Sequence, residues 1–69
     1  MTKFMRLKEV MEMTAMSRSN VYKMMSEGRF PQSVSLGARA VAWVESEVQD
    51  WILERIALRD GGVETQATN

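Results

Sequence analysis

A short stretch of the chain, from Ser17 to Glu27, is dense in side chains that donate hydrogen bonds or carry positive charge. On a helical wheel four of them lie opposite an apolar side that includes Val21: Ser19, Tyr22, Lys23 and Ser26. Arg18 and Asn20 flank these four at the N-terminal end, and no acid occurs before Glu27. Arginine and lysine bond guanine acceptors or neutralise phosphate, and asparagine pairs with adenine. We name this set the reading face: Arg18, Ser19, Asn20, Tyr22, Lys23 and Ser26. Because any small helix has a solvated polar side, this pattern alone does not separate DNA recognition from ordinary solvation.

Residues for catalysis or metal binding are scarce in this chain. It contains neither cysteine nor histidine, which removes disulfides, thiolate or imidazole metal ligands and the commonest catalytic base. Three acids lie close together, but at the first turn of a helix the helix dipole explains them: Glu45, Glu47 and Asp50. No nucleophile has a base beside it, and no glycine-rich phosphate loop occurs. We therefore expect no enzyme, no cofactor and no metal.

Two short helices joined by a tight turn must position the reading face. Apolar side chains at Leu7, Val10 and Met11 predict a first helix of roughly two turns from Leu7. Thr14 to Met16 interrupts it, and Ser17 can accept a hydrogen bond from the N–H three residues later, as a helix N-cap does. The second helix ends at Gly28, which suits the left-handed position after a helix. This order predicts a helix-turn-helix, in which the second helix enters the major groove.

Between Gln32 and Trp43 the apolar period changes from helical spacing to alternation, which predicts a β-hairpin. A two-residue turn at Gly37-Ala38 and a four-residue loop from Gly37 to Ala40 are both compatible with the pattern. Either turn leaves Arg39 near the tip of the hairpin. Either also places four apolar side chains on one face: Val34, Leu36, Val41 and Trp43.

A third helix is predicted from about Glu45 to Arg59, with acids early and bases late relative to its dipole. Its apolar stripe is Val44, Val48, Trp51 and Ile52, with Arg55 on the same face, where its stem can lie along the apolar surface. Leu53 lies off that stripe; a contact with a partner is one interpretation, but a single exposed leucine is ordinary and is the interpretation we favour. The tail from Asp60 to Asn69 has no apolar pattern and is predicted to be disordered.

The predicted fold class is therefore mainly α with a small β-hairpin, a winged helix-turn-helix in one domain over residues 1–59, followed by a tail over 60–69. In this fold the hairpin is a wing that lies over phosphates or reaches into the minor groove. Four further basic residues are predicted to contact the DNA backbone: Arg39 on the wing, Arg29 after the second helix, and Arg6 and Lys8 at the first helix.

Net charge zero hides a division along the chain. Residues 1–43 hold seven bases and three acids, a net charge of +4, whereas residues 44–69 hold two bases and six acids, a net charge of −4. Such asymmetry indicates an anionic partner for the basic part. No apolar run approaches the length of a membrane span, and the N-terminal stretch lacks the apolar segment of a signal peptide. We expect a soluble, cytoplasmic protein without a membrane partner.

The motifs SRSNVY at Ser17 to Tyr22, GRFP at Gly28 to Pro31 and LGARAVAW at Leu36 to Trp43 resemble the AlpA family of prophage and genomic-island regulators. The resemblance extends from Arg6 to about Arg55. It implies a MerR-like winged helix-turn-helix related to phage excisionases, which binds double-stranded DNA at the integrase promoter or attachment-site region of a mobile element. The family usually has glycine at the position of Ala15; if the turn there needs positive φ, alanine is strained by about 1 kcal/mol.

Two alternatives remain beside a transcriptional regulator of integrase and excision genes. An excisionase would bend attachment-site DNA and contact integrase or neighbouring copies, and a single reading helix favours self-association on DNA in either case. A protein-interaction adaptor could use the methionines as an adaptable groove, although Met11, Met24 and Met25 fall on the faces expected to form the core. The acidic third helix is the surface we expect to meet protein partners.

Overall fold

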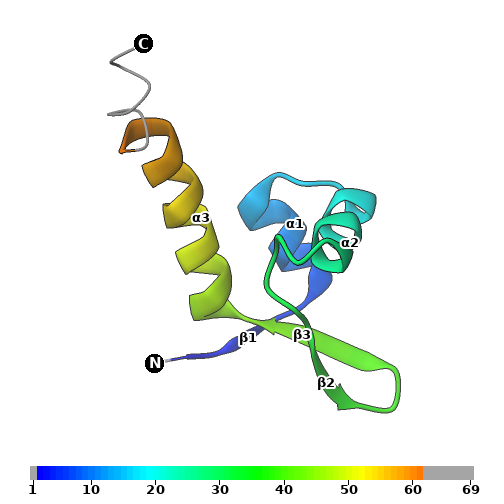
Figure 1. Ribbon diagram of the computed structural model, residues 1–69. Coiled ribbons are helices and arrows are strands. Elements are labelled where there is room, and N and C mark those ends of the chain that lie inside the picture. The colour runs from blue at the N-terminus through cyan, green and yellow to red at the C-terminus, as the bar shows by residue number, and fades with distance from the viewer. Residues whose placement is uncertain (1, 62–69) are drawn as a thin grey trace.

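The computed structural model describes residues 2–61 and contains three helices and a small antiparallel sheet (Figure 1). In chain order the elements are β1 (Phe4–Met5), α1 (Leu7–Thr14), α2 (Arg18–Ser26), β2 (Val34–Gly37), β3 (Ala40–Val44) and α3 (Glu45–Asp60). The helices α1 and α2 form a helix-turn-helix, and β2 and β3 form the wing that follows it. The predicted fold class is confirmed. The helix α3 ends at Asp60, one residue later than predicted, and the rest of the predicted tail, residues 62–69, lies outside the described residues.

The turn between α1 and α2 is closed by side-chain and backbone hydrogen bonds. Thr14 Oγ1 donates to the Val10 carbonyl over 2.7 Å and accepts from the Met16 N–H over 3.3 Å. Ala15 takes the left-handed conformation, with φ 62° and ψ 20°, and its N–H donates to the Met11 carbonyl over 2.8 Å. An alanine in this region costs about 1–2 kcal/mol, because its Cβ crowds the carbonyl oxygen. The turn therefore has positive φ at Ala15, a point that the sequence alone did not decide.

The helix α2 begins and ends as its sequence predicts. Ser17 Oγ accepts from the Asn20 N–H over 3.2 Å, which satisfies one of the free amides of the first turn. At the other end Gly28 has φ 72°, and the Arg29 N–H donates to the Met24 carbonyl over 2.8 Å. The chain then leaves toward β2 through Phe30, which is buried.

The wing belongs to a three-stranded sheet of order β1-β3-β2, whereas the sequence predicted a two-stranded hairpin. The strand β1 pairs with β3 through Phe4 opposite Val44 and Met5 opposite Trp43. A strand of two residues is too short to show alternation, so the amino-acid pattern carried no signal for it. Its effect is to place Met5, 5% exposed, in the core beside Trp43.

The predicted register of the wing is wrong. Gly37 pairs with Ala40 around a turn at Ala38 and Arg39, but Val34 pairs with Ala42 and Ser35 with Val41, so one residue of β2 is left over as a bulge. A shift of one residue moves a strand's side chains to the other face. Val34 and Leu36 therefore do not share a face with Trp43 as predicted. Their side chains are 37% and 44% exposed, whereas Trp43 is fully buried.

The core lies where the helices cover the inner face of the sheet. Its buried members come from every element except β2 and from the α2–β2 connection: Met5, Val10, Val21, Phe30, Trp43 and Val48. Four methionines pack against this cluster: Met11, Met16, Met24 and Met25. The prediction that Met11, Met24 and Met25 face the core is confirmed. Only the N-terminal part of α3 packs on the body, and its C-terminal half projects away from it (Figure 1). None of the described helices is long and apolar enough to cross a membrane.

Candidate nucleic-acid interface

The helix α2 divides into an exposed polar side and a buried apolar side. All six residues of the reading face are exposed, whereas Val21 is fully buried and Met24 and Met25 are half-buried. The apolar side is held against α1 and the sheet, so the reading face is turned outward over the length of the helix. All six residues that the sequence assigned to the reading face are thus open to an outside partner on α2.

The N-terminus of α2 offers backbone donors next to a cation. The first N–H groups of a helix have no partners within the helix. In α2 the Ser17 hydroxyl oxygen accepts a hydrogen bond from the Asn20 N–H. Within the described residues, the N–H groups of Arg18 and Ser19 have no partner and remain available to an outside acceptor. The Arg18 guanidinium carbon lies 6.0 Å from the centre of the Tyr22 ring, a distance at which a cation is attracted to the ring. This end of the helix can hold a phosphate oxygen.

Tyr22 is more closely tied to the body than the helical wheel predicts. Its ring meets the Trp43 indole at a centroid distance of 6.1 Å and an interplanar angle of 68°, an edge-to-face contact. The side chain is nevertheless 40% exposed. Tyr22 thus connects α2 to the central strand β3 and still presents part of its surface to the outside.

Hydrogen bonding limits what Ser26 can do in recognition. Its hydroxyl donates to the Lys23 carbonyl over 2.7 Å, so its proton is already used inside the helix. The oxygen keeps its capacity to accept a hydrogen bond. Ser26 can therefore accept from a base amino group, while Lys23, whose ammonium is exposed, remains a donor.

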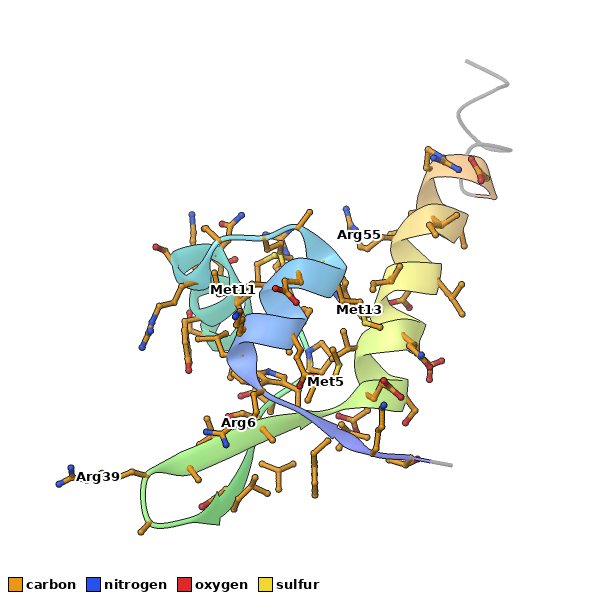
Figure 2. The ribbon with its side chains drawn as sticks, turned by 180° about the vertical axis from the view of Figure 1, so that it is seen from behind. Met5, Arg6, Met11, Met13, Arg39 and Arg55 are labelled. Atoms are coloured by element: carbon orange, nitrogen blue, oxygen red, sulfur yellow. The ribbon has the colours of Figure 1, made fainter. Side chains whose placement is uncertain are left out.

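The wing presents its basic residue at the tip. Arg39 occupies the second position of the turn with φ 63°, and its side chain extends away from the body (Figure 2). Arg6, at the N-cap of α1, points to the same side of the molecule in this view, and its N–H donates to the Glu9 carboxylate over 2.9 Å. Lys8, on the first turn of α1, is exposed.

Arg29 differs from the other predicted backbone contacts because both its side chain and its carbonyl have partners. The guanidinium forms an ion pair with Glu27 at 3.2 Å. The carbonyl accepts a hydrogen bond from Trp51 Nε1 over 2.8 Å, and Phe30 meets the Trp51 ring edge-to-face at 4.9 Å. This pair of contacts fixes the segment that connects α2 to the wing against α3. An outside phosphate would have to compete with Glu27 for Arg29.

The sequence missed the two tryptophans as supports of this surface. The sequence predicts Trp43 on the apolar face of the hairpin and Trp51 on the apolar stripe of the third helix, yet Trp43 contacts Tyr22 and Trp51 donates a hydrogen bond to the Arg29 carbonyl. Their partners are distant in sequence, and no local pattern reports such pairs. The predicted position of Arg55 along the apolar side of α3 is confirmed, with its guanidinium carbon 5.9 Å from the Trp51 ring centre.

Acidic side chains are concentrated away from α2. The helix α3 stands on the opposite side of the molecule from α2 and the wing tip (Figures 1 and 2). An open groove of about 630 Å³ between α3 and the start of β2 is lined by Glu47, Asp50 and Glu54. In residues 2–61 no group of three histidine, cysteine or acidic residues is arranged to hold a metal ion. The side that carries the reading face is thus separated from the side that would repel a polyanion.

Comparison with known proteins gives one family and two informative relatives. The family model described as "Prophage CP4-57 regulatory protein (AlpA)" matches residues 3–56. An uncharacterized protein of Enterobacteria phage P4 is 47% identical over 60 residues, covering 87% of this chain and 68% of that protein. The DNA-binding transcriptional activator AlpA of Escherichia coli (strain K12) is 29% identical over 62 residues, covering 81% of this chain and 89% of the activator.

Proposed function

Because the chain belongs to the AlpA family of prophage regulatory proteins, we propose that it is a DNA-binding transcriptional regulator of a prophage or genomic island. The observation that carries this proposal is the outward-turned reading face on α2, next to a wing with Arg39 at its tip. The E. coli relative named as a DNA-binding transcriptional activator supports it. In this proposal the protein acts in the cytoplasm. It acts without a catalytic step, since nothing in its composition supplies a nucleophile with an activating base.

In the proposed complex α2 lies in the major groove. Lys23 and Asn20 reach base edges, while Arg18 and the first amides of α2 hold a phosphate. Arg39 lies over the backbone or in the adjacent minor groove, and Arg6 and Lys8 contact phosphates beside α1. The acids of α3 remain on the side away from the duplex. Arg29 contributes only if DNA displaces Glu27 from it.

The target we propose is the promoter of the integrase and excision genes, or the attachment-site region near it. This choice rests on the resemblance to prophage regulators. One recognition helix contacts few base pairs, so useful specificity requires two or more copies on the DNA. Integrase is a candidate protein partner for the acidic surface of α3.

A footprint combined with a bend assay on the element's own attachment and integrase-promoter DNA tests the proposal. A regulator protects a discrete site at the integrase promoter and does not require a strong bend at the attachment site. Its affinity should also fall with salt at a slope of about −4 to −5 in log K against log salt, if about five phosphates are contacted. A strong bend at the attachment site would identify an excisionase instead. Weak affinity that is nearly independent of salt would contradict DNA recognition and favour a protein-interaction adaptor.

A further inference from the structure

The helix α3 carries a row of apolar side chains that the core uses only in part, because Ile52 packs against the core cluster whereas Leu53 and Ile56 do not. Leu53 is 62% exposed, Ile56 is 43% exposed and Ile52 is half-buried. Met13, 40% exposed at the end of α1, points toward α3 (Figure 2), where it lines a hollow together with Ile52 and Leu53. We call these four residues the α3 ridge. Leu53 is therefore part of a continuous apolar surface, whereas the sequence suggested a single exposed leucine.

A hollow lies beside the ridge and gives it a shape that can match itself. Its volume is about 330 Å³, and it is lined by Met13, Gln49, Ile52 and Leu53. The same surface thus offers both a projecting leucine and a recess lined mainly by apolar side chains. An interface between identical subunits needs this property, because under two-fold symmetry one patch must receive its own copy.

The charges around the α3 ridge also suit an interface between two copies of this chain. From Leu53 to Asp60 the helix carries two acids and two bases, Glu54 and Asp60 against Arg55 and Arg59, so the segment is neutral. On a helical wheel Arg59 lies about 90° to one side of the line between Leu53 and Ile56, and Asp50 lies about 90° to the other side. A two-fold axis parallel to α3, lying between the two helices, would bring the basic side of one helix against the acidic side of its copy. Neither DNA nor a strongly basic segment would find a net attraction here.

We propose that the α3 ridge is the interface between two copies of this chain, with the two α3 helices side by side and Leu53 of each copy in the hollow of the other. This interface goes beyond the proposed function and does not depend on it, since it forms without DNA. It would supply the second reading helix that a specific site requires.

Sedimentation equilibrium of the full chain without DNA tests the interface. The wild-type protein should show a concentration-dependent dimer at protein concentrations up to about 0.5 mM, a range that detects dissociation constants up to about 1 mM. Leu53→Asp should raise the dissociation constant at least tenfold, because two carboxylates would enter the apolar contact. Circular dichroism and thermal melting should remain close to those of the wild type, since Leu53 is outside the core.

Leu58→Asp is the matched control. Leu58 is also exposed, at 49%, but it lies about 140° around the helix from Leu53, away from the ridge. This variant should dimerise as the wild type does. A wild-type chain that stays monomeric over the whole range, or equal loss of dimer in the two variants, would overturn the proposal. A monomer that still gives a discrete footprint would reject the interface and leave the proposed function standing.

Discussion

The ring of Tyr22 on α2 stands edge-on to the indole of Trp43 on β3, with centroids 6.1 Å apart. This contact joins the helix that presents the reading face to the central strand of the wing sheet. Replacing Tyr22 therefore has two effects, on stability and on recognition. We predict that Tyr22→Ala lowers the free energy of unfolding by about 1–2 kcal/mol, through lost aromatic packing. Urea unfolding followed by tryptophan fluorescence measures this loss.

Tyr22→Phe separates the two effects, because it keeps the ring and removes only the hydroxyl. Its free energy of unfolding should stay within about 0.5 kcal/mol of the wild type. Its preference for the specific site over a mutated site should fall by about 1 kcal/mol if the hydroxyl bonds DNA. An unchanged preference in Tyr22→Phe would restrict Tyr22 to holding α2 against the sheet.

Lys23→Ala tests whether α2 reads bases. We predict that it reduces discrimination between the specific site and a point-mutated site by about 1–3 kcal/mol, because one donor to a base edge is lost. Quantitative footprinting on both sites measures the difference. Lys8→Ala removes the same charge from α1 and should weaken both sites about equally. If the two variants behave alike, α2 does not lie in the groove as proposed.

Arg39→Ala tests the wing. Because its side chain extends from the tip of the turn, we predict weaker binding to all sequences and a salt slope less steep by about 1. Arg39→Lys should restore most of the affinity, since a phosphate contact needs charge more than shape. The salt dependence of binding, measured by fluorescence anisotropy, provides the slope. A slope unchanged in Arg39→Ala would place the wing away from the DNA backbone.

Features that depend on neighbours in the chain were predictable from the sequence. The N-cap at Ser17, the stop at Gly28 and the apolar side of α2 each arise within a few residues, and the structure has all three. The reading face follows from the same local periodicity, so its exposure was predictable as well. Its contact with DNA remains a prediction.

Features that depend on pairing between distant segments were not predictable. The strand β1 exists because Met5 pairs with Trp43, 38 positions later, and a two-residue strand has no period of its own. The bulge in β2 shifts the register by one residue and leaves Val34 exposed, although the alternation of apolar residues predicts that Val34 shares a face with Trp43. Nothing in the local sequence distinguishes a continuous strand from a bulged one here, because both keep Arg39 near the tip.

Trp51→Phe tests the attachment of the α2–β2 connection to α3. It removes the indole N–H that donates to the Arg29 carbonyl over 2.8 Å, and we predict a loss of about 0.5–1.5 kcal/mol in the free energy of unfolding. Arg29→Ala is the control: it removes the exposed ion pair with Glu27 but keeps the carbonyl, and should cost less than about 0.5 kcal/mol. Equal losses in urea unfolding would show that the Arg29 side chain, rather than its carbonyl, makes the attachment.

Ala15→Gly tests the turn between α1 and α2. Ala15 has φ 62°, where alanine is strained by about 1–2 kcal/mol and glycine is not. Glycine also makes the unfolded chain more flexible, which offsets part of this gain, so we predict a net stabilisation of about 0.5–1 kcal/mol. In a domain of this size that corresponds to a rise in Tm of about 2–8 °C, which calorimetry can measure. Ala57→Gly, at an exposed position inside α3, should instead destabilise by about 1 kcal/mol, because its backbone is right-handed. The two substitutions are chemically identical, so opposite signs would isolate the left-handed turn as the cause, and a loss of stability in both would contradict the positive φ at Ala15.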